Sequence, residues 1–150
     1  MTEVVVVFVV TLSIIFIMKV STHLMFQNGR AKAALDLYRS VFPCFSVTSI
    51  EKYGPEDDAA GQIKIAEIDF DGHRLIVIDS PIQHQFDFTP SMSLFVNFDN
   101  NADLECAFEK LAVDGKIMMP LDNYGFSARF GWVSDVFGVS WQLNLPATGS

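Results

Sequence analysis

The sequence predicts an α+β protein made of two βαβββ units, and three observations lead to this prediction. The 150 residues are 50% hydrophobic and 19% charged, which is the composition of one globular domain. Strand-like alternation and helix-like spacing of apolar residues follow one another in the same order in each half of the chain. The second half repeats this order at an offset of about 70 residues.

The first half begins with a predicted strand at residues 20–27, where side chains alternate between two faces. A helix follows, because apolar residues share one helical stripe that Pro43 ends: Ala31, Ala34, Leu35, Tyr38, Val41 and Phe42. Residues 45–53, 62–70 and 74–79 are predicted strands. The pair Asp71-Gly72 predicts a hairpin between the last two.

The second half begins with an alternating segment at residues 92–98, which predicts a strand. A helix ending before Gly115 is predicted from the spacing of Leu104, Ala107, Phe108 and Leu111. Strands are then predicted at residues 116–119, 126–134 and 139–145. The predicted organisation is a first module at 20–80, a linker at 81–91, a second module at 92–146 and a tail at 147–150.

An almost unbroken apolar run at residues 4–18 precedes the first module. As a helix it would be about 22 Å long, shorter than the roughly 30 Å hydrocarbon core of a membrane. A signal peptide would begin with basic residues, but this run follows Glu3. Three interpretations of residues 1–19 stay open: a leader outside the fold that is dispensable or misassigned, a membrane anchor, and an extra strand or interface segment.

Charge and cysteine content limit the partners and the compartment. The net charge is −8, with 10 Lys and Arg against 18 Asp and Glu, which argues against nucleic acid as a partner. Cys44 and Cys106 form no CxxC motif and no Cys/His spacing, so we expect free thiols in the cytoplasm. The alternative location is at a membrane, anchored by the apolar run.

Two segments resemble a known family: LYRSVFP at the end of the first helix, and GKIMMPLDNYGFSARFGWVSDVFGVSWQLNL in the second half. They resemble the PhnB-like branch of the vicinal oxygen chelate superfamily, which includes glyoxalase I, bleomycin-resistance proteins and extradiol dioxygenases. The resemblance covers residues 20–146. It implies a glyoxalase-like fold, in which the two modules form a cupped mixed β-sheet with helices on its outer face, and a homodimer.

This branch also carries the name 3-demethylubiquinone-9 3-methyltransferase. A fold that binds an adenosyl cofactor needs a glycine-rich turn between a strand and a helix. The sequence contains no Gly-x-Gly, so it does not support methyl transfer.

Enzymes of the superfamily hold a divalent cation with one His or Glu from each of four strands. The resemblance assigns the first position to His23, the second to Asp79 and the fourth to Gln142. The third falls on Ser93 or Phe95, which do not suit such a cation. The implied set of His23, Asp79 and Gln142 is therefore incomplete. It leaves a metal-dependent lyase, isomerase or dioxygenase of the glyoxalase type as the alternative function.

Strand alternation predicts a small-molecule site independently of the resemblance. In each of three predicted strands one face is apolar and the opposite face is mainly polar. The residues on these mainly polar faces are Ser21, His23, Met25 and Gln27; Ser93, Phe95 and Asn97; and Ser140, Gln142 and Asn144. We expect the helices to cover the apolar faces and the polar faces to line a pocket. A solvated sheet face or a dimer interface is the alternative interpretation.

The predicted function is small-molecule binding in this cup, without an assigned reaction. Arg129 is included as the cation available for an anionic group. The candidate binding residues are His23, Met25, Asp79, Ser93, Phe95, Arg129, Trp132 and Gln142.

Overall fold

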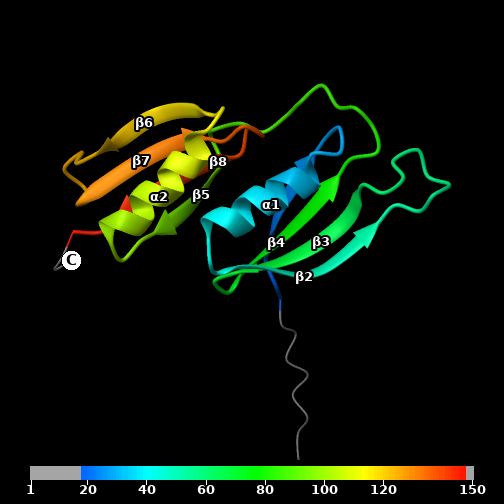
Figure 1. Ribbon diagram of the computed structural model, residues 1–150, viewed down its shortest axis with the longest axis horizontal. Helices are drawn as coiled ribbons and strands as arrows, with labels where there is room; N and C mark the ends of the chain where they lie inside the picture. Colours follow the sequence, from blue (N-terminus) through cyan, green and yellow to red (C-terminus); the bar gives the residue numbers. More distant parts are fainter. Residues whose placement is uncertain (1–17, 148–150) are drawn as a thin grey trace, which may run out of the picture.

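The computed structural model describes residues 18–147 and contains two four-stranded sheets and two helices (Figure 1). Module 1 consists of β1 (Thr22–Phe26), α1 (Ala31–Val41), β2 (Phe45–Lys52), β3 (Ile63–Phe70) and β4 (His73–Asp79). Module 2 consists of β5 (Ser93–Asn97), α2 (Asn101–Ala112), β6 (Lys116–Asp122), β7 (Arg129–Ser134) and β8 (Ser140–Leu145). This order confirms the predicted α+β class.

The two sheets have equivalent topology. Sheet A has the strand order β1-β4-β3-β2 and sheet B the order β5-β8-β7-β6. In each sheet the first and last strands of the module pair in parallel, and the other neighbours pair antiparallel. Both sheets are therefore mixed, as expected for a cupped mixed sheet.

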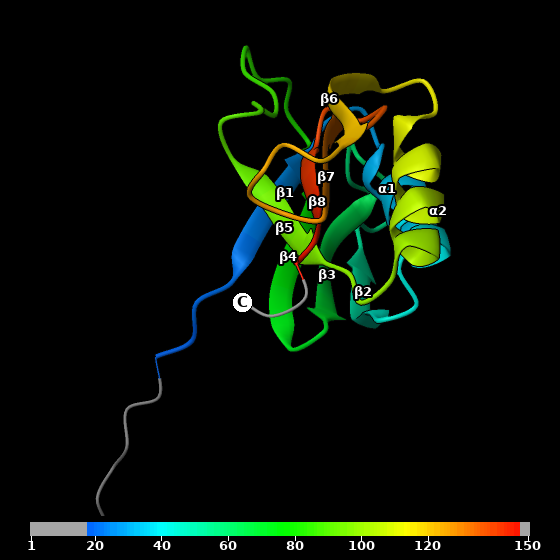
Figure 2. The same ribbon diagram turned by 90° about the vertical axis from the view of Figure 1, so that its left-hand side faces the viewer.

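Both helices lie on the same side of the two sheets (Figure 2). Gly131 in β7 lets α2 come close, because a Cβ atom there would lie 2.6 Å from Cε2 of Phe108. The faces that the helices leave uncovered consequently point to the other side of the molecule. We call these uncovered faces the open faces of sheets A and B.

The predicted strand at residues 116–119 is longer in the structure, because β6 continues through Pro120 to Asp122. Proline cannot donate a ladder hydrogen bond and is tolerated mainly in edge strands. β6 is an edge strand of sheet B, so the missing N–H costs little.

The apolar run of residues 4–18 lies outside the described residues except for Met18, which is exposed. Its three interpretations therefore stay predictions. Between residues 18 and 147, no helix is both long and apolar enough to span a membrane.

One aromatic core joins the modules. Trp141 of β8 is fully buried and contacts rings of module 1, with centroid distances of 4.9 Å to Tyr38, 5.0 Å to Phe42 and 6.3 Å to Phe70. Aromatic rings at such distances contribute dispersion and quadrupole attraction beyond their buried area. The sheets are thus held together on their helix-covered sides.

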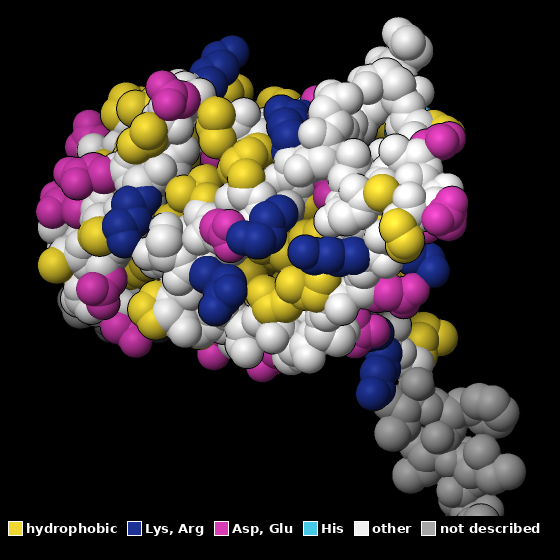
Figure 3. Space-filling view, turned by 45° about the vertical axis from the view of Figure 1, so that its right-hand side comes forward, with side chains coloured by type: hydrophobic (Ala, Val, Ile, Leu, Met, Phe, Trp, Pro, Cys, Tyr) yellow, Lys and Arg dark blue, Asp and Glu magenta, His cyan; other side chains and the backbone are white. Residues whose placement is uncertain are grey.

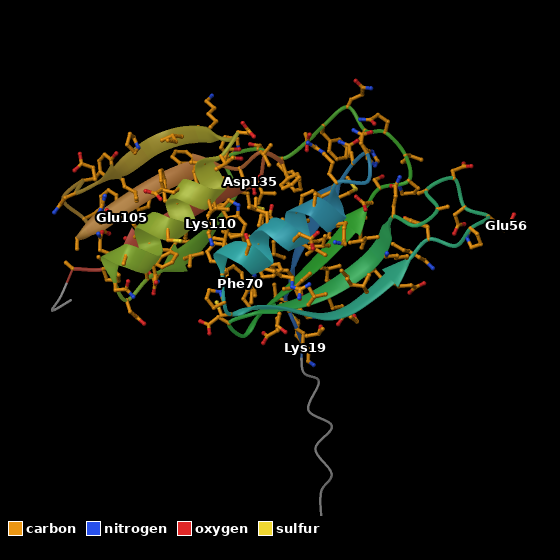
Figure 4. The ribbon with its side chains drawn as sticks, viewed as in Figure 1. Lys19, Glu56, Phe70, Glu105, Lys110 and Asp135 are labelled. Atoms are coloured by element: carbon orange, nitrogen blue, oxygen red, sulfur yellow. The ribbon has the colours of Figure 1, made fainter. Side chains whose placement is uncertain are left out.

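A buried carboxylate fixes this contact. Asp135 is 4% exposed and follows β7 directly. Its Oδ2 accepts hydrogen bonds from Tyr38 Oη at 2.8 Å and from Trp141 Nε1 at 2.9 Å, while its Oδ1 accepts from the backbone N–H groups of Phe137 and Val139. Tyr38 belongs to α1, so the carboxylate connects the two modules (Figure 4).

Burial is the main cause of the pKa shifts of Asp135 and Tyr38. Burial raises the pKa of the Asp135 carboxyl, against the hydrogen bonds from Trp141 and Tyr38, which lower it. Burial, followed by the nearby Asp135 charge, raises the pKa of the Tyr38 hydroxyl well above 10.0. Tyr38 therefore stays protonated in the folded protein and keeps donating to Asp135.

We expect Tyr38→Phe to lower the free energy of unfolding by about 2 kcal/mol, since it removes one donor from a buried charged acceptor. Urea denaturation at neutral pH measures the change. Asp58→Asn, at an exposed loop carboxyl, is the control and should change stability by less than about 0.5 kcal/mol. Equal effects of the two substitutions would contradict the assigned role of Tyr38.

The effect of Tyr38→Phe should also shrink above pH 10. The unfolded chain releases the Tyr38 proton near its ordinary pKa of 10.0, whereas the folded protein retains it. The contribution of Tyr38 to stability is therefore complete below pH 10 and is lost as the pH rises further. Denaturation curves of both proteins between pH 7 and pH 11 measure this, and a difference that is independent of pH would contradict it.

Candidate functional site

The open face of sheet B carries the greatest concentration of predicted site residues. The register aligns Phe95 of β5, Gln142 of β8 and Trp132 of β7 across three neighbouring strands. The rows on either side bring further residues to the same face: Ser93, Ser140 and Ser134 in one row, and Asn97, Asn144 and Phe130 in the other. The predicted grouping of Ser93, Phe95, Trp132 and Gln142 is thus present in the structure.

Hydrogen bonds connect the side chains at one end of this face. Trp132 Nε1 donates to Ser140 Oγ at 2.8 Å, and the Ser140 and Ser93 hydroxyls lie 2.7 Å apart. Gln142 Nε2 donates to Ser93 Oγ at 3.3 Å. Because each side chain is held by the next, these polar groups have defined orientations before any ligand arrives.

A second hydrogen-bonded group occupies the other end. Asn144 Nδ2 donates to Asn97 Oδ1 at 2.7 Å, and Ser127 Oγ donates to Asn144 Oδ1. Among the described residues, Asn97 Nδ2 and Gln142 Oε1 have no hydrogen-bond partner. These two amide groups give the face a free donor, Asn97 Nδ2, and a free acceptor, Gln142 Oε1.

Aromatic rings border these polar groups. Phe95 is 55% exposed and Phe126 is 63% exposed, although both are large apolar side chains. Both pack on Phe130, at centroid distances of 6.4 Å and 5.1 Å, and Tyr124 lies beside them. Exposed rings grouped in this way form an apolar platform that a flat ligand can cover.

His23 and Met25 lie on the open face of sheet A, as predicted. Their partners in β4 are Ile76 and Ile78, and the row of His23 and Ile76 continues to Glu67 of β3. His23 is exposed, and its imidazole has no hydrogen-bond partner among the described residues.

Asp79 lies on the opposite face of sheet A, which differs from the prediction that it faces the cup. It pairs in register with Phe26 on the helix-covered side and is 1% exposed. Its Oδ1 accepts from the backbone N–H of Ala31 at 2.8 Å and its Oδ2 from that of Ile63 at 3.0 Å. Asp79 therefore caps α1, which has no side-chain cap of its own.

Arg129 also lies on the helix-covered side, so it does not line the cup as predicted. Its guanidinium forms an ion pair with Glu105 of α2 and donates to Asn101 Oδ1 at 2.6 Å. The hydrogen bond from Arg129 lowers the pKa of the Glu105 carboxyl. These contacts of Arg129 thus connect α2 to β7. Because the guanidinium is paired with Glu105, it is not free to bind an anion in the cup.

The described residues do not fit a divalent cation of the glyoxalase type. The implied ligands His23 and Asp79 point to opposite sides of sheet A, and both Asp79 oxygens are taken by backbone donors. Gln142 is a neutral amide held by Ser93. Within residues 18–147, no three His, Cys, Asp or Glu side chains come together as a possible metal site.

Phe130 and Ser127 of this face were not among the predicted site residues. Phe130 shares the strand alternation of Trp132, so the sequence did contain a signal for it. Ser127 lies before β7, and its bond to Asn144 spans 17 residues. No local sequence pattern indicates that contact.

Several solved structures are similar to this chain. A PhnB protein from Bacillus cereus is 41% identical, with a TM-score of 0.81, and the match covers 85% of this chain and 99% of that one. A protein from Pseudomonas aeruginosa is 26% identical, with a TM-score of 0.74, over 86% of this chain and 98% of that one.

A glyoxylase/bleomycin resistance protein/dioxygenase domain from Frankia is 11% identical, with a TM-score of 0.61, over 89% of this chain and 96% of that one. At this identity the likeness concerns the fold alone. No curated protein sequence matches the chain.

The family model described as 3-demethylubiquinone-9 3-methyltransferase matches residues 18–144, which is most of the chain. Module 1, the linker and all of module 2 except Leu145 at the end of β8 lie inside this match. The chain therefore belongs to this PhnB-like family, and it shares its fold with the glyoxylase/bleomycin resistance protein/dioxygenase domain.

Proposed function

We propose that this protein binds an uncharged, flat small molecule on the open face of sheet B. The observation that carries the proposal is the pairing of oriented polar groups with exposed aromatic rings on one face. Gln142 Oε1 and Asn97 Nδ2 supply a free acceptor and a free donor, and Phe95 and Phe126 supply apolar area. This combination of convergent polar groups and aromatic rings is typical of ligand sites.

The polar groups of the face favour an uncharged ligand. The hydrogen-bonded residues on it are Ser, Asn, Gln and Trp, and none carries a charge. The one basic side chain predicted to lie there, Arg129, is paired with Glu105 on the other side of the sheet. A charged ligand would lose its hydration without gaining an opposite charge. The free-energy cost of this desolvation is larger than for a neutral ligand.

We also propose that the protein is a homodimer, as the resemblance implies. β1 and β2 are the outer strands of sheet A, and β5 and β6 those of sheet B. Edge strands present unpaired backbone N–H and C=O groups, which pair readily with a second chain. A cytoplasmic location is proposed because Cys44 and Cys106 are both free thiols.

Residues 20–146 are proposed to form the functional unit, with modules at 20–80 and 92–146. Every strand pair and the aromatic core lie between Thr22 and Leu145. The residues of the proposed site lie in module 2.

Benzamide is a suitable first probe, because it combines a flat ring with one amide donor and acceptor. We expect it to quench the fluorescence of Trp132 on the open face, while the buried Trp141 supplies a constant background. Benzoate and benzylammonium, its charged counterparts, should bind at least about tenfold more weakly than benzamide. Fluorescence titration gives the three dissociation constants.

Two variants and a chelator are the controls for this titration. Trp132→Phe should abolish the quenching signal, and Gln142→Ala should weaken binding about tenfold by removing a hydrogen bond. A chelator should leave binding unchanged. Stronger binding of benzoate, or chelator-sensitive binding restored by a divalent ion, would contradict the proposal.

Light scattering of the full chain should give twice the chain mass of 16.7 kDa. Phe95→Lys should keep that mass and weaken benzamide binding, because Phe95 belongs to the proposed ligand site and not to a dimer contact. A monomer mass for the native protein contradicts the dimer. Conversion of the variant to a monomer would assign the open face to the dimer interface instead.

A chain lacking residues 1–17 should fold with an unchanged melting temperature, because the strand pairs and core begin at Thr22. Circular dichroism during heating measures this, with the full chain as the control. An insoluble or destabilised product would show that the apolar run completes the core or an interface.

A further inference from the structure

A groove runs along the outer edge of β2, the edge strand of sheet A. Its volume is about 540 Å³, which is comparable with known binding clefts. The groove is formed by the end of α1, the turn after it and most of β2, and its lining residues are Arg39, Pro43, Phe45, Ser46, Val47, Thr48, Ser49 and Ile50. None of them belongs to the proposed ligand site in module 2.

The groove follows the edge of the strand and is not confined to one of its faces. Val47 and Ile50 are in register with buried residues of β3, so their side chains face the helix-covered side. Ser46 and Ser49 lie in other rows, and Ser49 is in register with Glu67 on the open face. Among the described residues no other strand pairs with this edge. Backbone N–H and C=O groups along it are therefore available to a further strand.

Apolar side chains that line the groove are incompletely covered. Ile50 is 46% exposed, although its register partner Ala66 is fully buried. Val47 is half-buried, and Pro43 in the turn after α1 is exposed. Exposed apolar surface beside an unpaired strand edge favours a partner strand that carries apolar side chains at alternate positions.

The charge of the groove is positive, in contrast to the net charge of −8 of the chain. Arg39 is the one charged residue among those that line it, and within residues 18–147 its guanidinium has no hydrogen-bond or ion-pair partner. Lys52 at the end of β2 is likewise exposed and unpaired in the described part of the chain, and it is in register with the buried Ile63. On the side of the molecule seen in Figure 3, Lys and Arg side chains gather around exposed hydrophobic ones.

The acidic side chains of the adjoining elements do not cancel this charge. Glu51 is in register with Ile65 of β3, and its carboxylate accepts a hydrogen bond from Lys64 Nζ at 2.7 Å. Asp36 of α1 accepts one from Lys32 Nζ at 2.5 Å. Both carboxylates are therefore already paired, whereas Arg39 is free to meet the carboxylate of a partner.

We propose that the outer edge of β2 binds an extended, acidic peptide segment of another protein as an additional strand. The peptide backbone forms hydrogen bonds with the unpaired N–H and C=O groups of β2, which supply affinity. Apolar side chains at alternate positions of the peptide cover Val47 and Ile50. Its acidic side chains pair with Arg39 and Lys52, which supply selectivity for a negatively charged partner.

An acidic peptide fits this edge better than a second copy of the chain does. Two copies related by a two-fold axis would pair their β2 strands antiparallel. The end of one strand, with Lys52, would then lie at the start of the other, next to the end of α1 with Arg39, so like charges would meet. The register also shifts between Val47 and Ser49, which bends the edge, and a flexible peptide can follow this bend. The proposed homodimer does not need this edge, because β1, β5 and β6 are edge strands too.

The test is an NMR titration of the ¹⁵N-labelled full chain with the acetylated and amidated peptide Glu-Thr-Val-Thr-Val-Thr-Glu. In an extended peptide the valines and glutamates share one face, which matches the apolar and basic side chains on the helix-covered side of β2. We expect saturable shifts of the backbone amide signals of residues 45–52 and of Arg39. Amide hydrogen exchange in β2 should slow at least about tenfold at saturation.

Three control peptides separate charge from backbone pairing. Replacing both Glu by Gln should weaken binding about tenfold, because two exposed ion pairs are lost. Successive N–H groups of a strand point to opposite edges, so N-methylation of the Thr residues in one peptide and of the Val residues in another blocks opposite edges. One of these two peptides should lose at least about tenfold in affinity, whereas the other should bind nearly as well as the parent.

Variants of the chain test the role of the cation. Arg39→Gln should weaken binding of the acidic peptide about threefold. Lys116→Gln is the matched control, because Lys116 is an exposed cation in β6, the equivalent edge strand of sheet B, and it should change nothing. The peptide Lys-Thr-Val-Thr-Val-Thr-Lys should bind Arg39→Glu more tightly than it binds the native chain. Arg39 and Lys116 are exposed, and the amide spectrum of each variant reports directly whether it is folded.

Equal binding of the Glu and Gln peptides, or equal binding of the two N-methylated peptides, would overturn the proposal. Amide shifts centred outside β2 and the end of α1 would overturn it as well. Slow exchange of the β2 amides without peptide, lost on dilution to a monomer, would show that a second copy covers this edge instead.

Discussion

The buried carboxylate of Asp135 is the contact on which the arrangement of the modules depends. An ionised group that has lost its water is stable only when donors replace the water, and here Tyr38, Trp141 and two backbone N–H groups do so. Tyr38 comes from module 1, whereas the other donors come from module 2. Separating the modules would therefore remove the Tyr38 donor as well as the aromatic contacts of Trp141. The hydrogen bond and the ring contacts thus stabilise the same arrangement of the modules.

This contact also determines where binding can occur. The modules meet through the sides covered by α1 and α2, which leaves both open faces pointing away from the core (Figure 2). The same meeting leaves a cavity between the end of α1 and α2, where Lys110 spans the gap to Ser40. The open face of sheet B and this cavity, which Cys44 and Cys106 line, both result from one packing arrangement. The face and the cavity carry different chemical groups.

Periodicity in the sequence predicts the elements well, because apolar alternation and helical stripes reflect burial against one core. It also predicts that Phe95 shares a face with Ser93 and that Gln142 shares one with Ser140, since residues two apart on a strand point the same way, and the register aligns these faces. The resemblance places Asp79 in the cup, and Arg129 is expected there as the available cation, but both lie on the helix-covered side. Each is a charged residue at the end of a strand, and its partner, Ala31 or Glu105, is distant in the sequence. Only the folded chain shows that these charges cap α1 and fasten α2.

The place of Arg129 decides which charges remain on the open face of sheet B. Because Arg129 is paired with Glu105 on the other side of that sheet, the hydrogen-bonded side chains on the open face are neutral. Neutral hydroxyl and amide groups orient a ligand through hydrogen bonds, but they supply neither strong polarisation of a carbonyl nor a counter-charge. The family name refers to methyl transfer, which requires a site for an adenosyl cofactor. The glycines between residues 18 and 147 stand singly, and several lie in turns or close contacts instead. The open face is therefore better suited to recognising a molecule than to transforming it.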